Sequence, residues 1–257
     1  FIDNSTLIYA GDNKLIKIID IDKNSIIKTL KGHTGNITSI DWLAKKQIIA
    51  SASLDKTVKI WNIENEDPLY NLTNHIERVN TVRFSYNGNY LATGSKDNNI
   101  FIYDTESFKQ VKKFKVHQSG VNDLIFDKTG KYIITATGSY FGGEDFQSKL
   151  IDINEERVTK IFNEHYDYVT NLVFFGVGDI FFLSGSSDFT VKAWGGETED
   201  SLFTFRGHTD YVNRILVTSD SKYIISCSSD KTIKVWETGI DEDINSIKKT
   251  LKNYILD

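Results

Sequence analysis

Apolar and polar positions alternate along this chain in short segments that are separated by turn residues. Residues 37–42, 79–84 and 212–216 each mix apolar and polar side chains over five or six positions, which is typical of a half-buried β-strand. Turn residues such as those at 86–89 (Tyr-Asn-Gly-Asn) follow, and Asn and Gly accept the positive φ that tight hairpins need. No ten-residue segment carries a convincing helical stripe. The pattern therefore predicts an all-β protein.

The strand pattern repeats with a step of about 42 residues. The repeat is marked by the five histidines, which are His33, His75, His117, His165 and His208. After each histidine come a first strand, a second strand rich in small residues, a turn with a third strand, and a fourth strand. Four such strands form an antiparallel sheet, and stacking successive sheets around an axis buries their faces and protects most edges. The repeat predicts a β-propeller.

Short motifs recur at fixed places in this repeat. Gly-His pairs precede first strands at residues 32–33 and 207–208, and an aromatic residue followed by a polar residue or glycine ends third strands. These pairs are Trp61-Asn62, Tyr103-Asp104, Trp194-Gly195 and Trp236-Glu237. With these motifs the chain resembles the WD-repeat family over nearly its whole length. The resemblance implies a WD-repeat β-propeller that serves as a platform for other proteins.

Six blades are visible, and we expect them to belong to a single propeller domain over residues 1–257. The expected blades are residues 1–31, 33–73, 75–115, 117–161, 165–206 and 208–252. The first has only its last three strands and lacks the innermost one. Two interpretations remain: the tail at 253–257 completes this first blade and closes a ring of six, or the segment belongs to a propeller of seven or more blades. We expect the second, because the sequence contains no Met.

The resemblance also implies a structural role for the histidines. In the family, this His joins a Ser or Thr of the second strand, the turn Asp and the Trp in a hydrogen-bonded chain that stabilises the blade. The expected sets are His33, Ser51, Asp55 and Trp61; His165, Ser184, Asp188 and Trp194; and His208, Ser226, Asp230 and Trp236. One such set per blade argues against a single catalytic centre.

Two blades depart from this expected set. In the blade at 75–115, Tyr103 replaces Trp beside His75, Thr93 and Asp97, so we expect a weaker network. In the blade at 117–161, His117 and Thr135 remain, but Ile151 occupies the Trp position.

The composition and the missing motifs disfavour several classes of function. The chain carries a net charge of −5 with a sequence pI near 5.6, which disfavours direct nucleic-acid binding. Its one cysteine, Cys227, cannot form an internal disulfide, and no zinc spacing, nucleophile elbow or phosphate-binding loop is present. We therefore expect no enzyme activity, no cofactor and no metal. The absence of a visible signal peptide or membrane span favours an intracellular protein, in the cytoplasm or the nucleus.

Departures from the repeat indicate a partner-binding face. The third repeat inserts a glycine-rich loop at 138–146 that contains Tyr140, Phe141 and Phe146. The resemblance places this loop and the histidine loops on one face, around the mouth of the central channel. Residues that enter or follow the first strands on that face are Arg78, Tyr168, Tyr211 and Asn213. Aromatic and Arg side chains are favoured at interfaces, although a tolerated insertion and ordinary exposed strand ends explain the same pattern.

Three functions fit these features. The leading hypothesis is a non-catalytic scaffold within a larger complex, binding a peptide or loop at the mouth and further partners on the rim. The first alternative is a substrate or peptide receptor of a ubiquitin-ligase or other regulatory complex. The scarcity of Arg, and the lack of Arg two places after each Trp-Asp-like pair, weaken it. The second alternative is a protein-binding component of a ribosome-assembly or other ribonucleoprotein complex.

Overall fold

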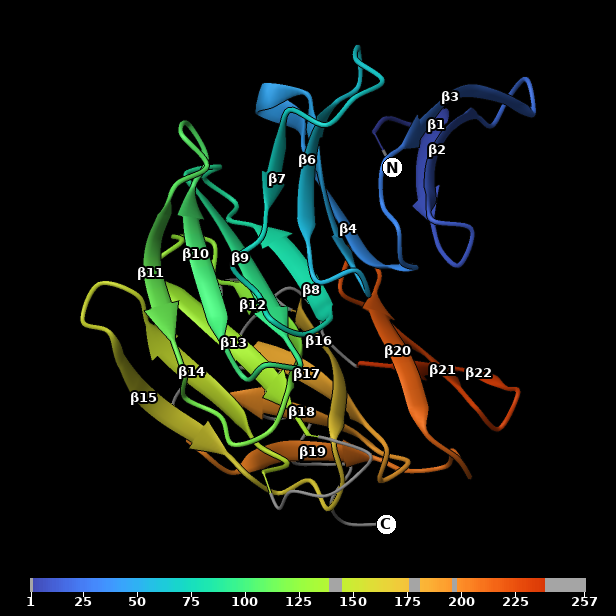
Figure 1. Ribbon diagram of the computed structural model, residues 1–257. Helices are drawn as coiled ribbons and strands as arrows, with labels where there is room; N and C mark the ends of the chain where they lie inside the picture. Colours follow the sequence, from blue (N-terminus) through green and yellow to red (C-terminus); the bar gives the residue numbers. More distant parts are fainter. Residues whose placement is uncertain (1, 139–144, 176–180, 196–197, 239–257) are drawn as a thin grey trace. The chain divides into compact units, whose positions relative to one another are not determined.

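A computed structural model describes residues 2–138, 145–175, 181–195 and 198–238 as a succession of short β-strands (Figure 1). Within these residues there are 22 strands and one short 3₁₀ helix, η1 (Ala44–Lys46). None of the described helical segments has the length and apolar character needed to cross a bilayer. The chain divides into two compact units, Phe1–Gly130 and Lys131–Asp257, and each is described by itself.

The first unit contains antiparallel sheets whose strands follow one another in chain order. Its three-stranded sheet is formed by β1 (Thr6–Ala10), β2 (Leu15–Asp20) and β3 (Ser25–Lys31). The next sheet has four strands: β4 (Ile37–Leu43), β5 (Ile48–Ser53), β6 (Val58–Asn62) and β7 (Tyr70–Leu72). The following sheet also has four: β8 (Val79–Phe84), β9 (Tyr90–Ser95), β10 (Ile100–Asp104) and β11 (Gln110–Phe114). Strand β12 (Val121–Phe126) then lies beside β8.

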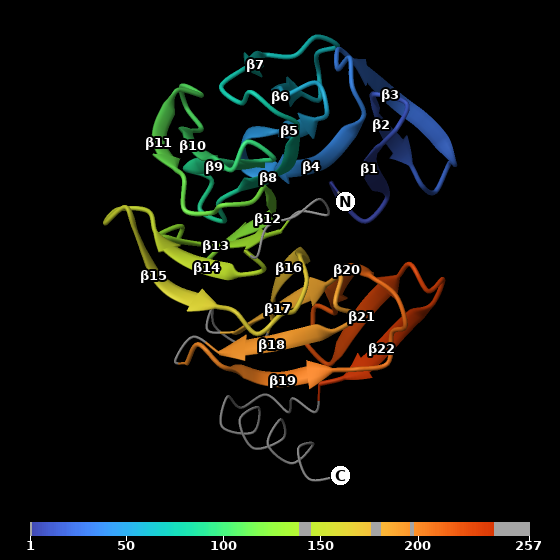
Figure 2. The ribbon, with the colours of Figure 1, turned by 60° about the horizontal axis from the view of Figure 1, so that its bottom comes forward.

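The second unit continues the same meander. Its first strands are β13 (Tyr132–Thr137), β14 (Ser148–Asp152) and β15 (Arg157–Phe162). A four-stranded sheet follows, with β16 (Val169–Phe175), β17 (Phe181–Ser186), β18 (Val191–Gly195) and β19 (Ser201–Phe205). The last described sheet comprises β20 (Val212–Val217), β21 (Tyr223–Ser228) and β22 (Ile233–Glu237). Figure 2 shows these last two sheets side by side, with β16 against β20.

The all-β fold class and the six blades predicted from the repeat are confirmed, including a first blade of only three strands. A cavity of about 290 Å³ lies between β1 and β4, lined by Ile8, Ile40, Asp41, Trp42 and Ile49. The fourth strand expected in the last blade lies outside the described residues. The single domain expected over residues 1–257 stays a prediction.

The small residues of the second strands are explained by packing on both faces. All six residues of β5 and of β17 are buried, because each second strand lies inside its sheet and its sheet packs against a neighbour. Gly94 in β9 shows how close this packing is. A Cβ added there would lie 2.6 Å from Val121 Cγ1 and 2.9 Å from Thr81 Cγ2. Large side chains at these positions would push adjacent sheets apart.

A bulge recurs in the first strands and links neighbouring sheets. In β4 the register passes from Ile37 to Ser39, so Thr38 is the extra residue. Its hydroxyl donates to the Val79 carbonyl of the next first strand at 2.6 Å. The extra residue at the same place in β8 donates likewise, from Asn80 to the Val121 carbonyl at 2.8 Å. The bulge thus turns a polar side chain toward the adjacent sheet.

The second unit repeats this link. The register of β16 skips Thr170, whose hydroxyl donates to the Val212 carbonyl of β20 at 2.6 Å. The register of β20 skips Asn213 in the same way. The amide of Asn213 donates instead to the Ser229 hydroxyl at 3.0 Å. Asn213 is therefore the one of these four bulge residues whose described hydrogen bonds stay within its own sheet.

Candidate functional site

Three blades contain the same buried hydrogen-bonded chain. In the first, His33 Nδ1 lies 2.8 Å from Asp55 Oδ2 and His33 Nε2 lies 2.7 Å from Ser51 Oγ. The indole Nε1–H of Trp61 donates to the same Ser51 Oγ at 2.8 Å. The equivalent contacts in the other two blades span 2.6–2.9 Å, within the sets His165, Asp188, Ser184, Trp194 and His208, Asp230, Ser226, Trp236.

The direction of the protons in this chain follows from the donors. An indole N–H can only donate, so Trp61 uses one acceptor position of Ser51 Oγ. Nδ1–H of the ring donates to the Asp55 carboxylate. With a neutral imidazole, Nε2 accepts the Ser51 hydroxyl proton; the other acceptor near that hydroxyl is the Lys59 carbonyl, at the longer distance of 3.5 Å. Each blade is thus stabilised by a relay with every donor matched to an acceptor.

Burial supports the neutral imidazole. Burial lowers the pKa of His33 and of His75 below the ordinary value and outweighs the opposing carboxylates of Asp55 and Asp97. For Asp188, burial alone would raise the pKa. Hydrogen bonds from His165 and Thr190 outweigh it and lower the pKa of Asp188 to about 2. The network therefore holds a carboxylate and a neutral histidine near neutral pH.

The blade at 75–115 uses a different aromatic partner. His75 lies 2.9 Å from Asp97 Oδ2 and 2.8 Å from Thr93 Oγ1. The buried Tyr103 hydroxyl donates to Asn74 Oδ1 at 3.1 Å, and burial raises its pKa. The Tyr103 hydroxyl thus has Asn74 as its acceptor, and a hydrogen bond with Thr93 opposes the rise in its pKa. The weaker network expected in this blade stays a prediction.

The blade at 117–161 has residues in both units. His117 is buried in the first unit, whereas Thr135 and Ile151 are buried in the second. Ile151 pairs with Ile133 of the adjacent strand at the position where other blades have an aromatic ring.

These polar sets are arranged as structural elements, one in each of the blades that contain His33, His75, His165 and His208. Among the residues that the structure describes, no three His, Cys, Asp or Glu side chains are grouped so that they could hold a metal ion. The three complete chains each use both nitrogens of the imidazole ring in hydrogen bonds within their own blade. A ring committed in this way has no nitrogen left for a substrate.

Aromatic side chains gather at the loops that carry the histidines in the second unit. We call this surface the His-loop face and define it by residues 163–168, 187–190, 206–211 and 229–232. Tyr168 and Tyr211 lie with ring centroids 6.0 Å apart, and Phe189 lies 5.9 Å from Tyr211. Tyr168 and Tyr211 are half-buried, whereas Phe189 is exposed. The two tyrosines singled out in the sequence are thus brought together.

The other described residues that the sequence predicted to bind a partner are not part of this aromatic contact. Arg78 is exposed in the first unit, where its carbonyl accepts from Lys96 N–H at 3.0 Å. Asn213 is exposed beside Ser229, and Phe146 is half-buried. Tyr140 and Phe141 lie outside the described residues.

Sequence reasoning missed two features of the second unit. The first is Phe189, which occupies a turn position filled by Lys56, Asn98 and Lys231 in three other blades. That replacement was a signal available in the sequence. The second is a groove of about 320 Å³ between β19 and β22, lined by Phe203, Thr204, Phe205, Arg206, Val235, Trp236, Glu237 and Thr238.

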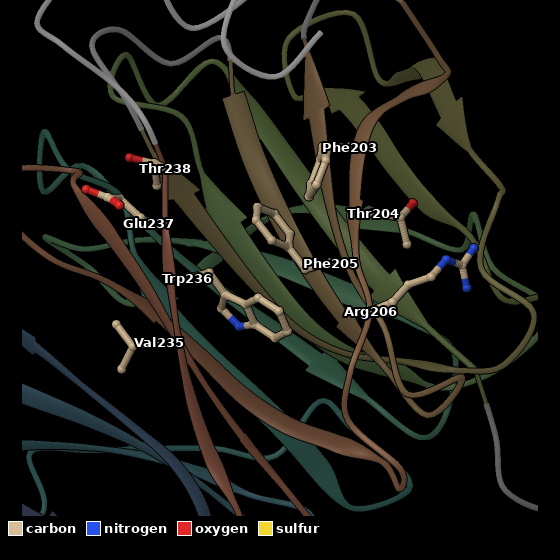
Figure 3. A pocket seen from close by; sticks show the side chains of 8 residues that line it. All are labelled: Phe203, Thr204, Phe205, Arg206, Val235, Trp236, Glu237 and Thr238. Atoms are coloured by element: carbon tan, nitrogen blue, oxygen red, sulfur yellow. The ribbon is translucent and has the colours of Figure 1, made fainter. Parts of the chain in front are cut away.

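Figure 3 shows the rings of Phe203, Phe205 and Trp236 close together in this groove. Phe203 and Phe205 lie 4.6 Å apart, and Phe205 lies 5.6 Å from Trp236. Phe205 and Trp236 occupy positions that are buried in other blades, so the sequence does not distinguish them from ordinary core residues.

Comparison with known protein families identifies the repeat. The model of the "WD domain, G-beta repeat" family matches residues 24–62, 66–104, 108–151, 156–195 and 199–237. The chain belongs to the WD-repeat family. Each match runs from the fourth strand of one sheet through the third strand of the next, so the sequence repeat is offset by one strand from the sheets.

Curated relatives share only part of this WD-repeat chain. A "DDB1- and CUL4-associated factor 11 homolog" from Caenorhabditis elegans is 28% identical over 115 residues, which is 42% of this chain and 20% of the relative. "DDB1- and CUL4-associated factor 13" from Dictyostelium discoideum is 36% identical over 59 residues, or 23% and 13%. "Protein SOF1" from Saccharomyces cerevisiae is 32% identical over 73 residues, or 24% and 15%. The matches thus span a fifth or less of each relative.

Proposed function

We propose that this WD-repeat protein is a non-catalytic scaffold that binds segments of other proteins within a larger complex. The observation that carries the proposal is the pair Tyr168–Tyr211, which lies half-buried on the His-loop face and contacts the exposed Phe189. Aromatic rings with one accessible side supply large contact area at small entropic cost, and they dominate binding hot spots. The family supports an interaction module, and the histidines serve their own blades.

The rigidity of the face also favours binding. The backbone N–H of Tyr168 donates to Asp167 Oδ1 at 2.7 Å, and that of Tyr211 donates to Asp210 Oδ1 at 2.8 Å. The Tyr168 carbonyl accepts from Ser187 N–H at 3.0 Å and from Ser186 Oγ–H at 3.1 Å. A loop held in this way loses little conformational freedom when a partner binds.

Affinity purification with matched variants tests the proposal. Tyr168→Ala and Tyr211→Ala should each remove a common set of bound proteins. Tyr86→Ala is the control, because Tyr86 is 77% exposed in the turn between β8 and β9, at the end of its sheet opposite the histidine loops. If the partners of the wild-type protein survive both His-loop substitutions, this face is not where they bind.

A receptor in a ubiquitin-ligase complex is a second candidate, favoured by the names of two relatives, which are associated with DDB1 and CUL4. The residues two places after the motif pairs weaken it, since they include Glu64 and Glu106 rather than Arg. Co-purification of DDB1 with the full chain tests this candidate. Stoichiometric DDB1 would favour the receptor, and its absence would leave the scaffold.

A further inference from the structure

We infer that the aromatic cluster of Tyr168, Phe189 and Tyr211 binds a cationic side chain, Lys or Arg, of a partner peptide. The inference deepens the proposed function and rests on it, because it names the chemistry of the segment that the His-loop face takes. Three independent features of the second unit carry it: the rings, the charge around them, and the backbone at Phe189.

The rings provide the surface. Phe189 lies over Tyr211 with an interplanar angle of 38°, and Tyr168 meets Tyr211 at 53°. Tyr166, on the same loop as Tyr168, is 83% exposed. The faces of Tyr and Phe rings carry negative potential, and a cation within about 6 Å of a ring centroid is attracted to them. Such a cluster therefore favours Lys or Arg over other polar side chains.

The charge of the surrounding loops has the matching sign. The His-loop face carries five carboxylates, which are Glu164, Asp167, Asp188, Asp210 and Asp230. Its basic side chains are Arg206 and Lys231, and Lys192 forms an ion pair with Glu164 at 3.3 Å, so the excess of carboxylates is two. Asp167 and Asp210 directly precede the two tyrosines and are each only partly buried. A peptide that approaches these rings meets a surface of net negative charge, which attracts basic segments and repels acidic ones.

The first unit lacks this combination. At the positions equivalent to Tyr168 and Tyr211 its blades have Asn36, Arg78 and Gly120. Its loops at 31–36, 54–57, 73–78 and 96–99 carry Lys31, Lys56, Arg78 and Lys96 against Asp55, Glu77 and Asp97. The aromatic and acidic character of the His-loop face is therefore not demanded by the repeat.

The backbone conformation at Phe189 indicates that local folding does not by itself favour an aromatic residue at this position. This residue has φ of 72°, the left-handed conformation, in a turn closed by its N–H to the Ser186 carbonyl at 3.3 Å. Lys56, Asn98 and Lys231 occupy the same turn position with φ between 66° and 71°. A bulky aromatic residue is disfavoured in this conformation, and its side chain is 40% exposed, so burial does not compensate.

The blades themselves supply a matched pair of variants. Phe189→Lys introduces the residue that two other blades carry at this turn position, so the turn keeps a tolerated residue while the ring is lost and a positive charge is gained. Asn98→Lys makes the equivalent substitution in the blade at 75–115 and adds the same charge away from the cluster. Tyr211→Asn introduces the residue that another blade carries at this position, Asn36, and removes a second ring.

The experiment measures binding of fluorescent ten-residue peptides to the full chain by anisotropy. The three peptides alternate Gly with Arg, Gln or Glu. The Arg peptide should bind at least tenfold more tightly than the Gln peptide, and the Glu peptide most weakly. Phe189→Lys and Tyr211→Asn should each weaken Arg-peptide binding at least fivefold, whereas Asn98→Lys should change it less than twofold. Circular dichroism and thermal melting establish that each variant is folded.

Several results would overturn the inference. They are equal binding of the Arg and Gln peptides, no Arg-peptide binding below 1 mM, or equal losses in Phe189→Lys and Asn98→Lys, since the last would mean that overall charge alone attracts the peptide. If cellular partners depend on Tyr168 while the Arg peptide shows no preference, the scaffold stands and the cation preference fails. If the Arg peptide binds the cluster but no partner depends on Tyr168 or Tyr211, the proposed function fails instead.

Discussion

Single hydroxyl groups connect the polar network of each complete blade. Ser51 Oγ accepts from the Trp61 indole and contacts His33 Nε2, while His33 Nδ1 hydrogen-bonds Asp55. Trp61 and Ser51 are both fully buried, so neither partner can turn to water if the hydroxyl is lost. Buried groups left without partners cost more than the hydrogen bonds themselves contribute.

Removing the hydroxyl should therefore lower the free energy of unfolding, and the loss should increase with the number of buried groups left without a hydrogen-bond partner. Ser51→Ala strands the Trp61 N–H and His33 Nε2, and we expect it to lower the free energy of unfolding by about 2–4 kcal/mol. Thr93→Val strands only His75 Nε2 among the hydrogen bonds described above, and should cost about 1–2 kcal/mol. Urea unfolding followed by tryptophan fluorescence measures both. Equal costs would show that the Trp–Ser bond contributes little.

Two buried histidines, His33 and His75, should make stability depend on pH in a defined direction. Burial lowers the pKa of each below the ordinary 6.5 in the folded state. The unfolded chain therefore binds protons first, and the stabilisation present above pH 6.5 is lost as the pH falls below it. Asp188, with a pKa of about 2, contributes stabilisation that is present above about pH 4 and lost toward pH 2.

Urea midpoints measured from pH 8 to pH 3 check this prediction. They should be nearly constant above pH 7 and decline below pH 6.5, with a further decline below pH 4. A midpoint that stays constant down to pH 5 would contradict the neutral imidazole assigned to the network.

At the scale of elements, close approach between neighbouring strands decides which residues the blades accept. Gly138 follows β13 with φ of 137°, next to the start of β16. A Cβ on Gly138 would lie 2.0 Å from Tyr168 Cβ and 2.5 Å from its Cα. The backbone itself would have to move, so the glycine fixes where Tyr168 enters its strand.

Gly138→Ala should consequently destabilise the protein by about 3 kcal/mol, because it adds both a clash and an unfavourable φ. Gly11→Ala is the control, since no atom lies within 4 Å of a Cβ added at Gly11, and it should change stability by less than about 0.5 kcal/mol. Thermal unfolding compares the two. A Gly138→Ala protein as stable as the control would show that β16 shifts at little cost.

At the scale of the whole molecule, net charge bounds the class of partner. With 35 acidic and 30 basic residues, the chain has a net charge of −5. Binding to a phosphate backbone depends on several Lys or Arg contacts that release counterions. We expect no binding of a 20-nucleotide single-stranded RNA tighter than about 100 µM at physiological salt. Fluorescence anisotropy measures it, and a micromolar affinity would point to a basic surface that the net charge conceals.

The sequence predicted more of the fold than of the candidate binding site. The Trp61-Asn62 type of pair, together with the histidine spacing, was sufficient to predict the strands and their order, because those residues repeat in register. The pairing of Tyr168 with Tyr211 was only implied, and Phe189 was missed. A contact between blades depends on side-chain directions that a repeat pattern does not contain.

The all-β class, the four-stranded repeat and the residues available to each polar network follow from the sequence alone, since each depends on local pattern and spacing. Three kinds of contact became visible only in the folded structure. The Tyr103 hydroxyl donates to Asn74, Thr38 and Thr170 link neighbouring sheets, and Phe189 packs against Tyr211, which in turn packs against Tyr168. These contacts join residues from different strands and blades. Packing of one sheet against the next brings them within range, and packing is a property of the folded chain.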